Sequence, residues 1–202
     1  VTSVVAEAVK REVGVEVCVI PHAVPEVFFQ AGSNRIPQET SSLKLLYVGE
    51  VSEKKGIKML MNVMKQLLDS KVTLTIVGNG PMVNQIKAGA ENITYFGPIY
   101  DRKKLAKIMA EHDVLMLLSH KTRTWEELFG IVIVEAIAAG CAVIASNHIG
   151  PRGIFENVGG RGLFNEEDLE GILKLVNSMV KDSSILEELI DEQNVARAYS
   201  TE

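Results

Sequence analysis

Apolar residues in this 202-residue chain gather into short runs of strand length, which alternate with segments of helical spacing. Within most of the short runs the apolar residues are continuous rather than alternating with polar ones, which is typical of parallel strands covered on both faces. The pattern therefore predicts an α/β fold, a Rossmann-like doubly wound parallel sheet. The predicted strands are Leu43–Val48, Val72–Val77, Ile93–Phe96, Val114–Leu118, Cys141–Ala145 and Gly162–Phe164.

The segments between and after these strands carry the spacing and the end signals of helices. Asp101 can cap one helix at its start, and Gly140 can stop another at its end. The predicted helices are Lys55–Ser70, Pro81–Gly89, Asp101–His112, Gly130–Ala139, Glu166–Val180 and Ser184–Ala198.

The first 42 residues differ from the rest because they contain no predicted strand. The polar stretch Gln30–Ser42 is predicted to be a loop that separates the opening segment, Val1–Ile20, from the main body. We interpret residues 1–42 as the end of a preceding domain and a linker, and residues 43–202 as one domain. The chain begins with Val rather than Met, so we expect it to be a fragment of a longer protein.

Composition narrows the class of protein. The net charge of −5 gives no sign of a nucleic-acid partner. Each apolar run is shorter than the ~20 residues that cross a bilayer, and no signal peptide is visible, so we expect a cytoplasmic protein. Cys18 and Cys141 are interpreted as small core residues, not as a disulfide or a metal pair.

The segment Trp125–Ala145 carries the most informative chemistry. Glu127 and Glu135 have seven residues between them, and Gly130 opens the predicted helix that contains the second acid. A helix N-terminus presents free N–H groups to a phosphate. Carboxylates accept strong hydrogen bonds from sugar hydroxyls. Together they indicate a nucleotide-sugar site.

Six motifs in the same order resemble the C-terminal, nucleotide-sugar-binding half of retaining GT-B glycosyltransferases of the large group-1 family. That resemblance implies transfer of a sugar, most often a hexose, from a nucleoside-diphosphate sugar to an acceptor hydroxyl with retention at the anomeric carbon. No cofactor and no protein-bound metal are implied. The motifs are VIPHAV (Val19–Val24), LYVGEVSEKKG (Leu46–Gly56), IVGNGP (Ile76–Pro81), FGPI (Phe96–Ile99), ELFGIVIVEAIAAGCAVIAS (Glu127–Ser146) and RGLF (Arg161–Phe164).

The resemblance also assigns roles to single residues. Glu127 lies at the acid position beside the donor sugar and the reaction centre, Glu135 at the position that binds ribose, and Lys55 at the position that neutralises the diphosphate. The remaining expected contacts are Phe129, Gly130 and Ile131 for sugar and phosphates, Gly49 and Gly78 past two strand ends, and Ile99 beside Tyr100 as walls of the base site.

Glu50 departs from the family pattern because it stands where an arginine is expected. Three explanations are open: Lys54 or Arg123 substitutes for that arginine, the donor sits differently, or activity is weak or lost. We favour substitution. Gly153 lies where the family often has an acid, and His120 and His148 are interpreted as ordinary loop histidines rather than substrate contacts.

The implied partners are a nucleoside-diphosphate sugar, an acceptor sugar, lipid or glycan, and an N-terminal domain absent from this chain. We expect the fragment alone to be inactive, and the full-length protein to act in the cytoplasm or at the cytoplasmic face of a membrane. A silent nucleotide-binding or scaffolding domain is the alternative from another class. A sugar-nucleotide epimerase of the same fold ranks lower because it lacks the Phe-Gly and Glu-Ala arrangement.

Overall fold

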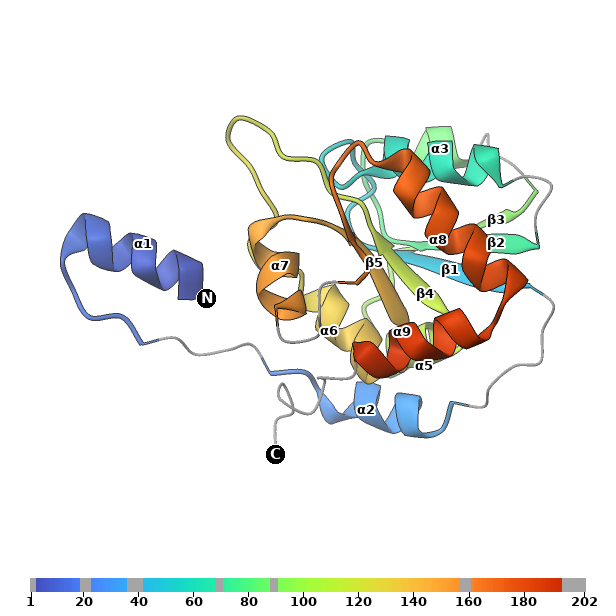
Figure 1. The fold of residues 1–202 in the computed structure, drawn as a ribbon, viewed down its shortest axis with the longest axis horizontal. Helices are drawn as coiled ribbons and strands as arrows, with labels where there is room; N and C mark the ends of the chain where they lie inside the picture. The colour runs from blue at the N-terminus through green and yellow to red at the C-terminus, as the bar shows by residue number, and fades with distance from the viewer. Residues whose placement is uncertain are drawn as a thin grey trace.

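The computed structural model describes residues 3–18, 23–35, 42–67, 71–87, 91–156 and 161–193. Its six parallel strands form one sheet in the order β3-β2-β1-β4-β5-β6, of which Figure 1 labels β1 to β5. Each predicted strand is present, with ends within a residue of expectation. The strands are β1 (Leu43–Val48), β2 (Val72–Val77), β3 (Ile93–Gly97), β4 (Val114–Leu117), β5 (Ala142–Ser146) and β6 (Leu163–Phe164).

Helices cover both faces of this sheet, so the prediction of a doubly wound α/β domain is confirmed. One face packs against α3 (Ile57–Gln66), α4 (Val83–Lys87), α8 (Leu169–Lys181) and α9 (Ser184–Glu192). The opposite face packs against α2 (Glu26–Ser33), α5 (Arg102–Ala110), α6 (Ile131–Ala138) and α7 (Ile149–Phe155). A further helix, α1 (Ser3–Val13), lies to one side of these layers in Figure 1.

The core sits on both sides of the central strands. Along β1 the side chains of Leu45 and Tyr47 point to one cluster and that of Leu46 to the other, because successive residues of a strand face opposite sides. All residues of β4 and β5 are buried, whereas the edge strand β3 is half exposed. The continuous runs of apolar residues in the sequence therefore correspond to the strands that are buried on both faces.

The loop prediction for Gln30–Ser42 is wrong at its start, because Gln30–Ser33 belongs to α2. Phe28 of this helix is fully buried in the core, and Val27, Phe29 and Ala31 pack partly buried against the same cluster. Phe28 also lies under the guanidinium of Arg102, 4.9 Å from ring centroid to Cζ. Sequence periodicity over eight residues did not show a helix that depends on these contacts with α5 and α6.

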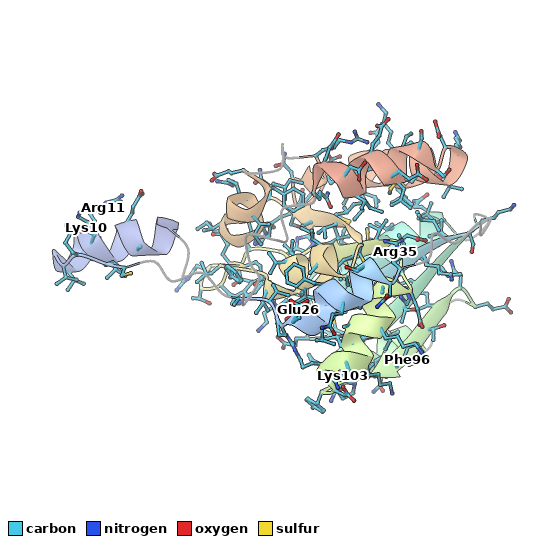
Figure 2. The ribbon with its side chains drawn as sticks, turned by 90° about the horizontal axis from the view of Figure 1, so that it is seen from below. Lys10, Arg11, Glu26, Arg35, Phe96 and Lys103 are labelled. Atoms are coloured by element: carbon cyan, nitrogen blue, oxygen red, sulfur yellow. The ribbon has the colours of Figure 1, made fainter. Side chains whose placement is uncertain are left out.

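Arg35 anchors the chain just past α2. Its guanidinium lies 2.8 Å from Oδ1 of Asp113 and donates to the carbonyl of Gly140. Figure 2 shows α2 crossing the body beside α5, with Arg35 and Lys103 labelled on the two segments. Residues 23–35 therefore pack on the sheet domain, while the proposed boundary at residue 42 stays a prediction.

Several predicted helix ends shift inward. The structure starts α8 at Leu169 rather than Glu166, because the side chain of Asp168 accepts from the N–H of Gly171 and caps the helix there. Asp101 caps α5 as predicted by accepting from the N–H groups of Lys103 and Lys104. Helices α1 and α7 were not predicted. Residues 1–2, 19–22, 36–41, 68–70, 88–90, 157–160 and 194–202 lie outside the described residues. Parts of the first motif, of the predicted loop Gln30–Ser42 and of several predicted helix ends fall there.

The two cysteines have different environments. Cys141 is buried, as predicted, and its thiol donates to the carbonyl of Met109 over 2.9 Å. Burial raises the pKa of the Cys141 thiol to about 12. The prediction for Cys18 is wrong: this residue is exposed, because residues 14–18 follow α1 outside the packed layers. Both are free thiols.

Candidate functional site

A cavity of about 480 Å³ opens where the carboxyl ends of β1 and β4 meet the start of α6. The strand order reverses between these two strands, and ligands of doubly wound sheets bind at this reversal. Its walls are both apolar and charged. The lining residues are Val48, Gly49, Glu50, Lys55, Arg102, Leu105, Leu117, Glu127, Phe129, Gly130, Ile131, Val132 and Glu135.

Most of the residues predicted for the site line this one cavity. They are Gly49, Lys55, Glu127, Phe129, Gly130, Ile131 and Glu135. Gly78 and Ile99 do not line it. Gly78 has a structural reason instead: a Cβ there would lie 1.8 Å from the carbonyl oxygen of Gly49, so the ends of β1 and β2 approach too closely for any side chain. Ile99 packs partly buried against the core.

Lys55 and Glu127 meet across the cavity. Nζ of Lys55 lies 2.5 Å from Oε2 of Glu127, and both side chains are mostly buried. The hydroxyl of Ser119 donates to the same oxygen over 3.5 Å. The ring of Trp125 lies 4.8 Å from the Lys55 ammonium, close enough for a cation–π contact. The cation and the acid that the resemblance placed near the donor are therefore neighbours.

Glu135 lies deeper, within the helix α6. Its side chain is 3% exposed and pairs with the guanidinium of Arg102, which is 46% exposed. Burial raises the pKa of Glu135, and the hydrogen bond and charge of Arg102 oppose this rise. Arg102 was not among the predicted site residues. It follows β3 closely, but the pairing joins residues 33 positions apart, and no local pattern reports such a contact.

Glu50, the departure from the family pattern, is neutralised at the mouth of the cavity. Its carboxylate lies 3.0 Å from Nζ of Lys54, which is four residues further along the chain. The phenol of Tyr47 donates to the carbonyl of Glu50 over 2.6 Å, and burial raises the pKa of Tyr47. Neither Lys54 nor Arg123 lines the cavity, although Arg102 does. The cavity therefore has a second cationic side chain, Arg102 of α5, in place of the expected Lys54 or Arg123.

Gly130 is the N-cap of α6 and adopts the left-handed conformation with φ +73°, which favours glycine. No side chain caps this end, and the first residues of the helix line the cavity. A helix N-terminus of this kind presents its N–H groups and positive dipole end to the space in front. The cavity therefore has a backbone anion seat beside its two cationic side chains.

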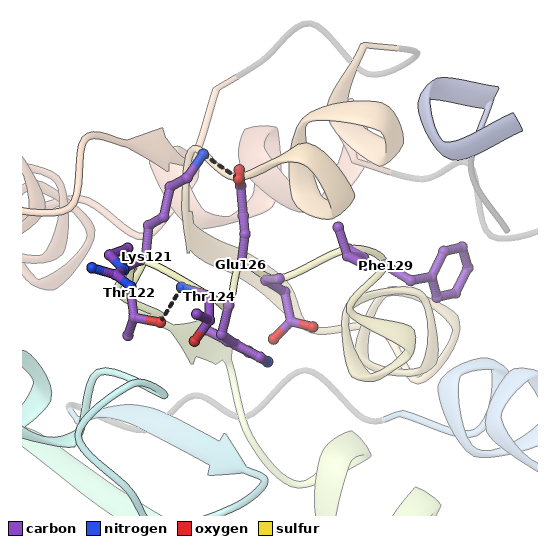
Figure 3. A pocket seen from close by; sticks show the side chains of 9 residues that line it. Lys121, Thr122, Thr124, Glu126 and Phe129 are labelled. Carbon is purple, nitrogen blue, oxygen red and sulfur yellow. Dashed lines mark hydrogen bonds and ion pairs between the residues drawn. The ribbon is translucent and has the colours of Figure 1, made fainter. Parts of the chain in front are cut away.

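The loop before α6 forms a second, more open cavity of about 590 Å³, lined by residues 121–129. Figure 3 shows Lys121 and Glu126 reaching toward each other as an ion pair, while the ring of Phe129 points away from the other labelled side chains. Phe129 packs against the core as well as lining the first cavity. Arg123 belongs to this loop cavity.

His148 and Glu166 hold this loop in place. The buried ring of His148 accepts at Nδ1 from the N–H of Glu127 over 3.2 Å, and its Nε2 lies 2.9 Å from Oε1 of Glu166. Glu166 also accepts from the N–H of Lys121 over 3.0 Å and lies 3.4 Å from Nδ1 of His120. The two histidines, interpreted as ordinary loop residues, thus brace both ends of the loop that carries Glu127.

The fold is a Rossmann-like domain with a charged cavity at the strand reversal. Residues 31–195 match the family described as Glycosyl transferases group 1, and the chain belongs to this family. Over 152 residues it is 28% identical to 2-deoxystreptamine N-acetyl-D-glucosaminyltransferase of Niallia circulans, covering 72% of this chain and 38% of that one. The chain spans about two fifths of the curated relatives it matches first.

Solved structures show the same fold. WaaG, a glycosyltransferase involved in lipopolysaccharide biosynthesis, superposes with a TM-score of 0.76 at 17% identity, over 100% of this chain and 58% of that one. Anabaena Alr3699/HepE, in complex with UDP and glucose, superposes at 0.66 with 19% identity, over 79% and 45%. The chain is thus a Rossmann-like domain of the kind found in GT-B glycosyltransferases.

Two further features are absent from the described residues. In that part of the chain no helix has the length and hydropathy to cross a membrane. Within the same residues, no three histidine, cysteine or carboxylate side chains are grouped so that they could hold a metal ion.

Proposed function

We propose that this chain is the donor-binding domain of a retaining glycosyltransferase, which transfers a sugar from a nucleoside-diphosphate sugar to an acceptor hydroxyl. The observation that carries the proposal is the convergence of Lys55, Glu127, Glu135 and the uncapped start of α6 on one cavity at the strand reversal. The related fold of Alr3699/HepE, which was solved with UDP and glucose, supports a nucleotide-sugar ligand.

In this proposal different groups of the cavity bind different parts of the donor. Lys55 and the N–H groups at Gly130 and Ile131 bind the diphosphate, and Glu135 accepts from the ribose hydroxyls. Glu127 orients the donor sugar without forming an obligatory covalent bond. Cations fixed beside the diphosphate lower the barrier, because negative charge grows on the leaving phosphate.

The reaction itself is proposed to be a front-face substitution. The bond from the anomeric carbon to the phosphate oxygen breaks, and a bond to the acceptor oxygen forms on the same face. The acceptor proton passes to the leaving phosphate. NMR of the product's anomeric proton, with the full-length enzyme, distinguishes retention from inversion.

The base is proposed to lie near the ends of β2 and β3, beside the cavity. The N–H of Gly78 donates to the carbonyl of Gly97 over 2.9 Å, so the two strand ends form one continuous rim. The side chain of Ile99 is partly buried and that of Tyr100 is 88% exposed. Tyr100 is thus available to stack on a base, with Ile99 behind it.

Groups for the acceptor are proposed to come from outside these residues, because the relatives have long segments that this chain does not match. The 202 residues alone should therefore bind donor without turnover. The acceptor would be a sugar, lipid or glycan, reached in the cytoplasm or at its membrane face. Clear sugar transfer by the isolated chain, in a donor-to-acceptor assay, would contradict this part of the proposal.

Calorimetric titration with UDP, GDP, ADP and their sugars tests the binding function. We expect a preference for one nucleotide, and a loss of about tenfold or more in affinity for Lys55→Gln because a charged contact to phosphate is removed. Lys58→Gln is the matched control, since Lys58 pairs with exposed Glu53 outside the cavity. Equal, weak binding of all nucleotides would favour a silent scaffolding domain instead.

A further inference from the structure

The lining of the cavity holds more carboxylates than cations before any ligand arrives. Its lining contains three carboxylates, Glu50, Glu127 and Glu135, and two cations, Lys55 and Arg102. Glu50 is neutralised by Lys54, and each cation of the lining is held by one of the other acids. A phosphate group therefore finds both cationic side chains already engaged, and binding has to displace a carboxylate from each.

We propose that the site recognises its ligand by exchange of ion pairs, with Arg102 as the second phosphate-binding cation. Arg102 and Lys55 move from Glu135 and Glu127 to phosphate oxygens, while both carboxylates accept hydrogen bonds from hydroxyl groups of the same ligand. This inference rests on the proposed function and deepens it, because it assigns a second phosphate-binding residue and a basis for preferring a nucleoside diphosphate to a bare anion.

Breaking the ion pair between Arg102 and Glu135 costs less free energy of hydration for Arg102 than for Glu135. Arg102 is half exposed on the first turn of α5, so its guanidinium can leave Glu135 and still be hydrated or bound by phosphate. Glu135 is 3% exposed in the interior of α6, so once Arg102 leaves it has little access to water. An unpaired buried carboxylate is strongly unfavourable unless hydrogen-bond donors replace the lost cation.

This asymmetry makes Glu135 a filter on the ligand. A bare anion such as pyrophosphate draws Arg102 away and leaves Glu135 without a donor. A nucleoside diphosphate supplies ribose hydroxyls at the same time and satisfies the carboxylate. Discrimination through a buried polar group left unpaired by the wrong ligand is stronger than discrimination through an added attraction. The raised pKa of Glu135 agrees with a carboxylate whose ionised form depends on its partner.

Titration of the 202-residue chain with inorganic pyrophosphate and with UDP, GDP and ADP tests the exchange. Glu135→Gln removes the carboxylate that holds Arg102, so pyrophosphate affinity should rise about tenfold, and the preference for the nucleoside diphosphate over pyrophosphate should shrink. Arg102→Gln should weaken the best nucleoside diphosphate about tenfold. Lys104→Gln is the matched control, because Lys104 is exposed on the same helix and does not line the cavity.

The outcomes of these titrations distinguish failure of the ion-pair exchange from failure of the proposed function. If the wild-type chain binds no nucleoside diphosphate, the proposed function fails and the exchange fails with it. If it binds one but Arg102→Gln behaves like Lys104→Gln, or Glu135→Gln leaves pyrophosphate binding unchanged, only the exchange is overturned. The double variant Arg102→Gln with Glu135→Gln keeps a neutral, hydrogen-bonding pair should the single Arg102 variant fail to fold, and it should lose the gain in pyrophosphate affinity.

Discussion

Nζ of Lys55 lies 2.5 Å from Oε2 of Glu127, although the two residues are 72 positions apart in the chain. Lys55 precedes α3 and Glu127 precedes α6, so this contact joins the loops that follow β1 and β4. These are the two strands between which the sheet reverses its order. The pair is therefore a bridge between the halves of the sheet as well as part of the candidate site.

The first prediction concerns the stability that this bridge provides. Lys55→Met should lower the free energy of unfolding by about 1–3 kcal/mol, because it leaves the mostly buried carboxylate of Glu127 without a cation. Adding Glu127→Gln should recover part of the loss, since the uncompensated charge is gone. Urea unfolding of both single variants and the double variant measures this coupling.

Lys58→Met provides the matched comparison for the bridge. Lys58 pairs with Glu53 at an exposed position, so its loss should change stability by about 0.5 kcal/mol or less. Equal losses for Lys55→Met and Lys58→Met, or strict additivity in the double variant, would show that the bridge has no special contribution.

The second prediction concerns Glu166, which braces the loop of residues 121–129. Glu166→Ala removes the acceptor of Lys121 N–H and the partner of His148, so the loop should open more often. Limited trypsin digestion should cut after Lys121 and Arg123 several times faster than in the wild type. Glu167→Ala, at an exposed neighbouring residue, should leave cleavage unchanged. Equal cleavage in both variants would rule out the brace.

The third prediction concerns Glu50 at the mouth of the cavity. Glu50→Arg replaces a carboxylate with a cation, so nucleoside diphosphates should bind about three- to tenfold more tightly at low salt. Calorimetry in two salt concentrations measures the gain and its screening. Glu53→Arg makes the same change of charge outside the cavity and serves as the control. No gain beyond that of the control would contradict the placement of the phosphates beside Glu50.

The fourth prediction concerns His112, whose ring is enclosed between α5 and β2. Nδ1 donates to the carbonyl of Ile108 over 2.6 Å, and Nε2 accepts from the hydroxyl of Thr75 over 2.7 Å. Burial lowers the pKa of His112, while the bond to Ile108 and nearby Asp113 oppose the shift. The unfolded chain therefore binds more protons than the folded one between the lowered pKa and the usual 6.5.

Because the folded chain binds fewer protons in this range, the contribution of His112 to the free energy of unfolding is complete above pH 6.5. That contribution falls as the pH drops from 6.5 through the lowered pKa. Urea unfolding at a series of pH values, for the wild type and His112→Asn, should show a difference that shrinks on acidification in this range. A difference independent of pH would contradict a buried neutral histidine.

The sequence predicted well those structural features that depend on residues close together in the chain. The strands follow from short apolar runs, and the cap of α5 follows from Asp101 itself. The convergence of Lys55, Glu127 and Glu135 follows from a parallel sheet, because strand ends at one edge bring their loops together. The roles assigned to these residues stay predictions.

What sequence did not show depends on contacts between distant segments. Arg102 is an ordinary surface arginine by its neighbours, and only its position opposite Glu135 brings it into the site. His148 looked like a loop residue because the acceptor role of its ring depends on Glu127, 21 positions earlier. The helix α2 forms around Phe28, whose partners come from α5 and α6. Such pairings leave no periodic signal in the chain.

The uncapped start of α6 means that ligand binding should also be visible as local folding. A helix whose opening amides have no capping side chain opens more readily at that end, and an acceptor that reaches those amides stabilises its first turn. A bound phosphate would slow hydrogen exchange at Ile131 and Val132 more than in the middle of the helix. The backbone of α6 would thereby record occupancy of the cavity without any label on the ligand.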